Sequence, residues 1–348
     1  MPRRRPADPD TDVLKTARER FTLADEADTQ QQQRERDDLA FYAGEQWPAD
    51  IENARKGQPA ISGMPAVPAR PTLVINKVRE PVRQIQNQVR GSDIGIELVP
   101  ADDFGDLGIT PDETEVTLRE GLIRRLQRAS QAQDARQWAA DRAVIAGRGY
   151  YLVMTRFLPG KTWDQEVYVH RIYNQAGVLL DPSHTAPDGS DADWEFMGTW
   201  VPWDRYGAEH PTLADGSENP CAGADESGFT SMAERYPTWY RADGHHRAVR
   251  VVDYWYTERS TVTYAVLTDG TVVDQDQVPK GVTPIDTRID VVKTIKWVKI
   301  GGGVHELGKT DWAGPDMPIV KVLGEELQPY DEQRRAEGMV RPMRESGR

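Results

Sequence analysis

Residues 132–154, with the sequence AQDARQWAADRAVIAGRGYYLVM, change from a helical pattern to an extended one within a short stretch. Apolar side chains recur there at the spacing of one helix face and are expected to point inward: Ala135, Trp138, Ala139 and Ile145. This helix is predicted to end at about Ala146. Gly147 and Gly149 then lead into the unbroken run Tyr150-Tyr151-Leu152-Val153-Met154, which predicts a buried strand. The chain therefore mixes helices and strands.

The sequence after this junction favours further strands. Residues 166–173 are expected to pair with the strand at 150–154. Apolar residues alternate at Val252, Tyr254 and Tyr256, again at Val262, Tyr264 and Val266, and from Ile289 to Trp297. Asp269-Gly270 is typical of a hairpin turn, and Gly301-Gly302-Gly303 of a turn between strands. Residues 317–323 are predicted to be the last strand, and a helix-like stretch begins at about Val340.

The sequence before the junction favours helices. Residues 10–43 are predicted to form one long helix, and its middle is polar on every side from Gln30 to Asp38. Such a helix is expected to pack by a thin stripe on a partner or to lie in solvent. A second helix is predicted to start near Pro81, with Asn76 as its cap, and to end at Gly91. A third is expected to open at Pro111, with Thr110 as its cap.

These patterns predict an α+β fold, with long N-terminal helices followed by a mixed helical and antiparallel β-rich region. Five regions are expected. They are an N-terminal helix with a Pro/Gly-rich loop at 1–72, a helical part with short strands at 73–180, an irregular acidic insert containing tryptophans at 181–247 with a short helix near 231–236, a β-rich part at 248–330, and the charged start of a helix at 331–348.

Composition excludes several classes of protein. The 348 residues include 43 Lys and Arg against 56 Asp and Glu, a formal net charge of −13, which argues against a protein that grips DNA by a basic surface. Cys221 is the only cysteine, so no intrachain disulfide is expected, in keeping with a reducing cytoplasm. Neither a secretory signal nor a membrane span is predicted, because no apolar run is long enough.

No catalytic, cofactor-binding or metal-binding residue is predicted. Asp188 to Asp193 resembles the start of a calcium loop, but a loop counted from Asp191 has Phe196 where glycine is required. His245 and His246 are adjacent, and on a strand adjacent side chains point to opposite faces. Asp191 and Glu195, near several tryptophans, leave a carbohydrate-active hydrolase open as an alternative.

Six strings, in order along the chain, together resemble one family. They are Phe41-Tyr42-Ala43-Gly44-Glu45-Gln46-Trp47; Arg70-Pro71 through Asn76, with Val82, Gln84, Asn87 and Arg90; the isoleucine-containing stretch that ends in Val99-Pro100; the junction from Asp134-Ala135 through Ala143 to Gly147, Gly149 and Tyr150; Asp181-Pro182-Ser183 with Ser190-Asp191-Ala192; and Met317-Pro318-Ile319-Val320 with Gly338-Met339-Val340-Arg341. The chain resembles the portal proteins of short-tailed, podovirus-type bacteriophages, and in particular their N-terminal or wing portion.

This resemblance implies a structural protein at the capsid vertex of a virion, assembled in the cytoplasm of the bacterial host. Family members form a ring, dodecameric in the family, through which double-stranded DNA passes without tight binding. The implied partners are other copies of the chain, the terminase large subunit, coat and scaffolding proteins, and a tail adaptor. Neither cofactor nor membrane is implied. Because the family continues into a stem and a clip, a fragment or a truncated gene product is expected. Another head-tail or adaptor component of the virion stays open as an alternative.

Overall fold

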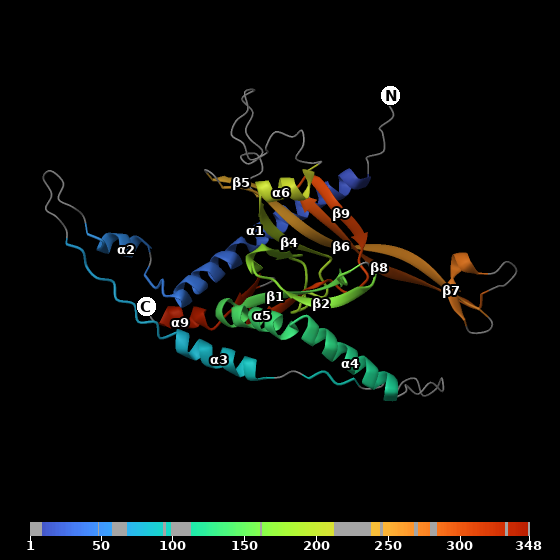
Figure 1. The fold of residues 1–348 in the computed structure, drawn as a ribbon, viewed down its shortest axis with the longest axis horizontal. Coiled ribbons are helices and arrows are strands. Elements are labelled where there is room, and N and C mark those ends of the chain that lie inside the picture. Colours follow the sequence, from blue (N-terminus) through green and yellow to red (C-terminus); the bar gives the residue numbers. More distant parts are fainter. Residues whose placement is uncertain are drawn as a thin grey trace, which may run out of the picture. The chain divides into compact units, whose positions relative to one another are not determined.

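The computed structural model describes residues 9–47, 49–57, 68–92, 95–98, 113–160, 162–211, 238–243, 246–267, 271–278, 284–330 and 333–346. They divide into two compact units. Unit 1 comprises Met1–Ala27 and Ala176–Met317, and unit 2 comprises Asp28–Gln175 and Pro318–Arg348. Each unit combines helices with antiparallel sheet, which confirms the α+β class (Figure 1). The five regions expected from the sequence stay a prediction.

Unit 1 is built on a seven-stranded antiparallel sheet. The main path runs β3-β4-β6-β8-β9, and β5 and β7 also pair with β6. The strands are β3 (Val178–Leu180), β4 (Trp194–Pro202), β5 (Tyr240–Asp243), β6 (His246–Val266), β7 (Val272–Asp274), β8 (Asp286–Gly301) and β9 (His305–Asp311), with a short 3-10 helix at Gln275–Gln277. The two alternating patches expected around residues 254 and 264 both lie in β6. The turn expected at Gly301–Gly303 joins β8 to β9, where Gly302 and Gly303 both have positive φ.

The core of unit 1 forms between this sheet and the first part of helix α1 (Pro9–Ala43). Ala17, Phe21 and Ala24 are spaced along one face of the helix and are fully buried. The Phe21 ring lies 5.3 Å from the Phe196 ring and 4.7 Å from the Trp239 ring. The long helix predicted over residues 10–43 is therefore confirmed, and its first part packs on aromatic side chains.

The prediction of an irregular insert over residues 181–247 is wrong for part of its length. Within it, β4 is a central strand between β3 and β6, and helix α6 (Trp203–Glu209) follows. Trp194 and Phe196 alternate into the core, because large aromatic side chains fit a half-buried pleated surface. The short helix expected near residues 231–236 lies outside the described residues, as does the turn at Asp269-Gly270, although β6 and β7 pair on either side of that turn.

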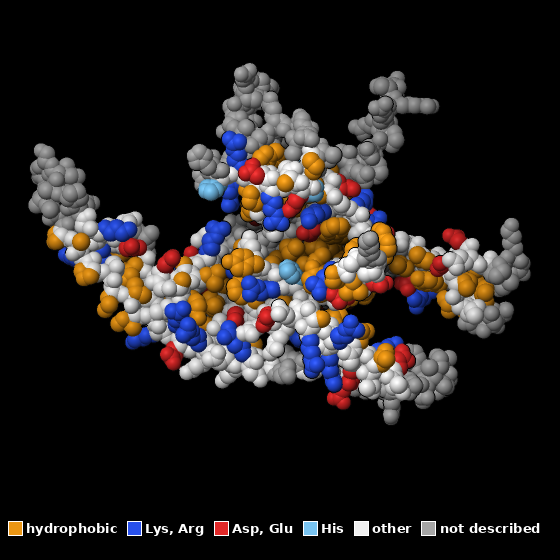
Figure 2. Space-filling view, viewed as in Figure 1, with side chains coloured by type: hydrophobic (Ala, Val, Ile, Leu, Met, Phe, Trp, Pro, Cys, Tyr) orange, Lys and Arg blue, Asp and Glu red, His pale blue; other side chains and the backbone are white. Residues whose placement is uncertain are grey.

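The outer part of β6 and β8 extends beyond the rest of this sheet. From Thr257 and Ile295 outward these strands pair with each other and, near the end, with β7, whereas in the described part of the chain the pairing of β4 stops at Tyr256 and that of β9 at Lys296. We call residues 257–267, 271–278 and 284–294 the arm. Figure 1 shows β7 at its far end, and hydrophobic side chains lie exposed along the arm in Figure 2.

Unit 2 contains most of the helices. They are α2 (Ala49–Arg55), α3 (Arg79–Gly91), α4 (Glu113–Ala129), α5 (Ala132–Ala146) and α9 (Val340–Ser346). Its three-stranded sheet has the order β10-β1-β2, with β1 (Arg148–Phe157), β2 (Gln165–Arg171) and β10 (Ile319–Leu323). A 3-10 helix at Gln175–Gly177 lies at the unit boundary. The predicted end of α5, the strand that follows and its pairing with β2 are all confirmed.

Several local expectations in unit 2 are wrong. Helix α3 begins at Arg79 with Val78 as its cap, so Pro81 lies within the first turn, where the helix needs no amide donor. Residues 317–323 do not contain the last strand, because β11 (Glu325–Tyr330) and β12 (Gln333–Glu337) follow as a hairpin. Both strands are rich in charged residues and lack the alternation of apolar and polar residues by which a strand is predicted from sequence. The helix expected from about Val340 is confirmed as α9.

Trp138 was expected to point inward, but 37% of it is exposed. Its indole N–H donates to the Ile172 carbonyl, and the guanidinium of Arg171 stacks on its ring.

The helix predicted from Pro111 is described from Glu113, and its proposed cap lies outside the described residues. None of the described helices is long and apolar enough to cross a membrane.

Candidate functional site

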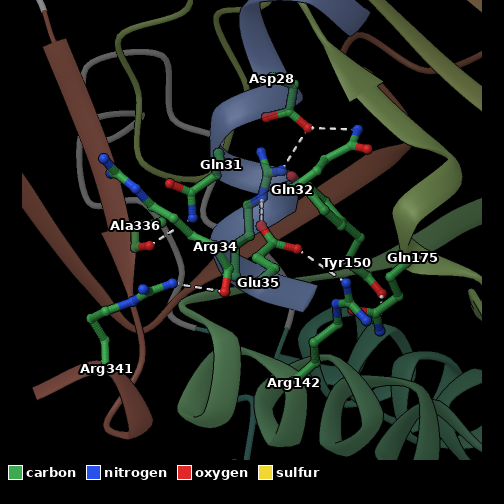
Figure 3. Close-up of polar contacts among 11 residues, drawn as sticks. Asp28, Gln31, Gln32, Arg34, Glu35, Arg142, Tyr150, Gln175, Ala336 and Arg341 are labelled. Carbon is green, nitrogen blue, oxygen red and sulfur yellow. Dashed lines mark hydrogen bonds and ion pairs between the residues drawn. The ribbon is translucent and has the colours of Figure 1, made fainter. Parts of the chain in front are cut away.

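A row of carboxylates lies on the part of α1 that belongs to unit 2, and Figure 3 shows two of its members, Asp28 and Glu35. Asp28, Glu35 and Asp38 follow each other at spacings of seven and three residues, which places them along one side of the helix. Glu35 is 4% exposed and Asp38 is 2% exposed. We call these three residues the carboxylate row. Buried carboxylates require charged partners, and in unit 2 arginines supply them.

Arg148, at the start of β1, bridges two members of the row. Its Nη2 lies 2.6 Å from Asp28 Oδ2, and its Nε donates to Glu35. Arg142 on α5 pairs with the other oxygen of Glu35, with Nη2 3.0 Å from Oε2. Burial disfavours the charged form of Arg148, but its neighbours Tyr150, Asp28 and Glu35 hold the pKa of Arg148 well above its ordinary value. The charges of two arginines and two carboxylates balance.

Asp38 is held from the C-terminal side of the chain. Arg341 Nε donates to Asp38 Oδ2 at 3.1 Å, and Arg341 Nη2 donates to the Arg34 carbonyl at 2.8 Å. Arg344 Nη1 lies 3.8 Å from Asp38 Oδ1. Burial raises the pKa of Asp38 to about 6, although both arginines act in the opposite direction. These contacts attach α9 to α1.

The expectation that the polar middle of α1 packs on a partner or lies in solvent is wrong, since Glu35 and Asp38 are buried inside unit 2. Sequence reasoning missed this because Arg142, Arg148 and Arg341 are more than 100 residues away in the chain. The one available signal was the spacing of Asp28, Glu35 and Asp38 on one side of the helix.

The first group of family-signature residues surrounds the end of α1. Gly44, with a φ of +115°, lets the chain leave the helix, and its N–H donates to the Ala40 carbonyl. Asn76 was expected to cap the next helix, but its Nδ2 donates to the Tyr42 carbonyl at 2.8 Å. Trp47 Nε1 donates to the Leu73 carbonyl at 3.3 Å. The structure therefore brings residues near 44 and near 74 together.

Other members of this first group have smaller contacts. Phe41 packs against the cluster around Val78 and Val82. The N–H of Arg70 donates to the carbonyl of Arg55, whose side chain stacks on Trp47. The N–H of Gln46 donates to the Gly44 carbonyl. The remaining members, Pro71, Gln84 and Asn87, are exposed.

The second group lies at the junction of α5 and β1. Gly147 has a φ of +99°, and a Cβ there would collide with the backbone of Ala336. At Gly149, a Cβ would collide with the backbone of Ala139. Tyr150 is buried beside the carboxylate row, and its carbonyl accepts from Gln175 Nε2 at 3.3 Å. Pro318 extends the pairing of β1, because its carbonyl accepts from the Val153 N–H at 2.8 Å.

The third group forms a loop in unit 1. Asp181 Oδ1 accepts from the N–H and the hydroxyl of Ser183, at 2.9 and 2.7 Å. Asp191 accepts from the N–H and the hydroxyl of Thr185 and from the Ala186 N–H. Burial is the largest single effect and raises the pKa of Asp191, but the hydrogen bonds from Thr185 and Ala186 together outweigh it and hold this pKa well below its ordinary value. Both carboxylates therefore act as turn acceptors.

The rest of this loop is tied in the same way. Ser190 donates to Asp188 Oδ1 through its hydroxyl at 2.9 Å, and the Ala192 N–H donates to the Gly189 carbonyl at 3.0 Å. Ala192 is buried, whereas Pro182 is exposed.

Among the described residues, no group of three His, Cys, Asp or Glu side chains is placed to hold a metal ion. Cys221 and His245 lie outside the described residues.

Comparison with protein families matches the model of the phage P22-like portal protein to residues 18–348. The chain belongs to this family. The portal family is structural, and its members are components of the phage capsid vertex. The match confirms the resemblance drawn from the six strings, all of which lie inside the matched range. The role of each signature residue in this portal chain stays a prediction. No curated protein matches the chain.

Proposed function

We propose that this portal chain is a subunit of a homo-oligomeric ring that forms the conduit for packaging and ejecting phage DNA. The family match over residues 18–348 carries this proposal. A ring of identical subunits needs two different surfaces on each chain, because only head-to-tail contacts close by rotation. The terminase large subunit, coat and scaffolding proteins and a tail adaptor would dock on the assembled ring, which forms in the host cytoplasm before joining the virion.

The net charge supports a conduit that does not retain its cargo. With a net charge of −13, the chain carries an excess of negative charge, which on the whole opposes the binding of phosphate groups. Sequence-independent DNA binding depends on neutralising phosphates with Lys and Arg, and an acidic subunit supplies little of that interaction. Double-stranded DNA would therefore pass through the ring without tight binding.

We propose a non-catalytic role. The hydrolase alternative depended on Asp191 as one of two acidic residues near tryptophans. Both oxygens of Asp191 accept hydrogen bonds from Thr185 and Ala186 within the loop, and its lowered pKa is unsuited to a general acid. No observation in the described residues favours the hydrolase over the structural role.

Imaging and mass measurement of the purified chain test the ring. Negative-stain electron microscopy, combined with sedimentation over a range of protein and salt concentrations, is expected to show closed rings with a central hole and a mass that is a multiple of 39.2 kDa. A chain that sediments as a monomer under every condition would contradict the ring proposal. Open filaments or compact dimers would contradict it too.

A further inference from the structure

One face of the arm in unit 1 carries an apolar row that is only half-buried. Val262, Tyr264 and Val266 alternate along β6 and therefore point to the same side. Their cross-strand partners share that side: Asp290, Arg288 and Asp286 on β8, and Asp274 and Val272 on β7. An apolar row thus runs between carboxylates on both neighbouring strands. We call this the acidic arm face.

Two observations indicate that this face requires a partner. Between Thr257 and Thr263, the arm is a two-stranded ribbon, and a ribbon of two strands is marginally stable in water. Val272 is 62% exposed, although the arm has little core of its own. One charge pair lies within the face, since Arg288 Nη2 is 2.5 Å from Asp290 Oδ2. This pair balances the charge of Asp290. The other two carboxylates of the face, Asp274 and Asp286, therefore give it an excess of negative charge.

Helix α4 of unit 2 presents the complementary surface. Leu118 and Leu122 are 69% and 60% exposed, and they lie on the side opposite the half-buried Val116 and Ile123. Arg125 continues the same stripe one turn further, with Arg128 beside it, and both are exposed. The apolar residues Val116, Leu122, Ile123 and Leu126 would by their spacing be expected to form one inward face of this helix, but the structure leaves Leu122 exposed. Figure 2 shows basic side chains gathered over α4.

We propose that the acidic arm face of one subunit docks on α4 of a neighbouring copy of this chain. The leucines would cover the row formed by Val262, Tyr264 and Val266, while the arginines would meet the carboxylates on the flanking strands. One surface lies on unit 1 and the other on unit 2, so the contact is heterologous and suits a ring. This inference rests on the proposed ring and names the contact that closes it.

Charge reversal on the full chain tests the contact. Asp274→Lys with Asp286→Lys gives an arm variant, and Arg125→Glu with Arg128→Glu gives a helix variant. Each is expected to raise the midpoint concentration of assembly by about tenfold or more at low salt, and by less at high salt, because both contacts become repulsive. Arg79→Glu with Arg83→Glu, two exposed arginines on α3, is the matched control and is expected to assemble normally.

Mixing the two variants separates docking between copies from a general loss of folding. In the mixture, the basic arm of the arm variant meets the acidic α4 of the helix variant, and the acidic arm of the helix variant meets the basic α4 of the arm variant, so assembly is expected to return. A chain that carries all four substitutions has opposite charges on its two surfaces and is expected to assemble as well. Misfolded variants would not rescue each other in this way. As a second readout, Val272→Cys with Leu122→Cys in a Cys221→Ser background is expected to give a ladder of oxidised multimers.

The outcomes distinguish this contact from the ring itself. If the unmodified chain forms rings and both reversals leave the assembly midpoint unchanged, the arm contact is wrong and the ring proposal stands. If each reversal weakens assembly but the mixture does not recover, direct docking of the arm on α4 is also wrong. A chain that never forms rings contradicts both proposals.

Discussion

Arg148 illustrates how one residue can set the local structure of this chain. Its guanidinium contacts Asp28 and Glu35 in a buried position beside Tyr150. A buried ion pair adds little stability compared with apolar packing, but removing one partner leaves charge uncompensated in a poorly solvated place. Removing one arginine is therefore expected to destabilise the chain by more than the intact ion pairs stabilise it.

We expect Arg148→Met to lower the free energy of unfolding by roughly 3–5 kcal/mol, because Asp28 and Glu35 lose a shared partner. Arg156→Met on the same strand is the control, since the pair that Arg156 forms with Glu166 is exposed, and it should cost at most about 1 kcal/mol. Urea denaturation of both variants measures the difference. Equal losses in the two variants would contradict the importance assigned to the buried network.

The raised pKa of Asp38 leads to a prediction of how the free energy of unfolding depends on pH. This pKa is raised from 3.8 to about 6, so the folded chain binds this proton more tightly than the unfolded chain does. The contribution of Asp38 to the free energy of unfolding is therefore most favourable below about pH 4 and declines as the pH rises to about 6. A two-unit shift corresponds to at most about 3 kcal/mol.

Asp38→Asn should remove this decline. The stability of the variant relative to the native chain is expected to increase between pH 4 and pH 7, as measured by denaturation at several pH values. Asp37→Asn is the matched control, because Asp37 is more exposed and also contacts Arg344. Parallel stability curves for Asp38→Asn and the native chain would show that Asp38 titrates normally.

At the scale of elements, the junction of α5 and β1 shows close backbone approach. Gly147 ends the helix in a left-handed conformation, and the backbone at Ala336 leaves no space for a side chain. Its N–H still donates to the Ala143 carbonyl at 2.8 Å, which completes the last turn. The β11–β12 hairpin can therefore lie directly against this turn.

We expect Gly147→Ala to destabilise unit 2 by roughly 2–5 kcal/mol, since backbone strain and overpacking both oppose it. Gly160→Ala isolates the first effect, because Gly160 also has a positive φ but has open space around it, and its cost should be only about 1–2 kcal/mol. Thermal and chemical unfolding measure both variants. If the two substitutions cost the same, the contact with Ala336 contributes nothing.

At the scale of the whole molecule, the chain passes repeatedly between two units. It leaves unit 1 within α1, returns after Gln175, and leaves again after Met317. Neither unit is a continuous segment. Local patterns follow the order of the chain, so they could not indicate this division. The acidic arm face lies on unit 1 and α4 on unit 2, so the chain offers two distinct surfaces of the kind that the proposed ring would need.

Local patterns determined a large part of the fold. The long helix α1, the passage from α5 into β1 and the alternation along β6 and β8 were all predicted, because periodicity and glycine placement act over a few residues. The α+β class followed from their order. The six strings pointed to the portal family, which the family comparison confirmed over residues 18–348.

Tertiary structure decided which of these elements are buried and what they contact. Sequence could not show that Glu35 meets Arg142 and Arg148, or that Trp194 lies in a central strand. It also could not show that Leu122 faces away from unit 2. A charged or aromatic side chain can be buried or exposed with nearly the same local pattern. The difference lies in its partners, which come from segments distant along the chain and are assembled only when the chain folds.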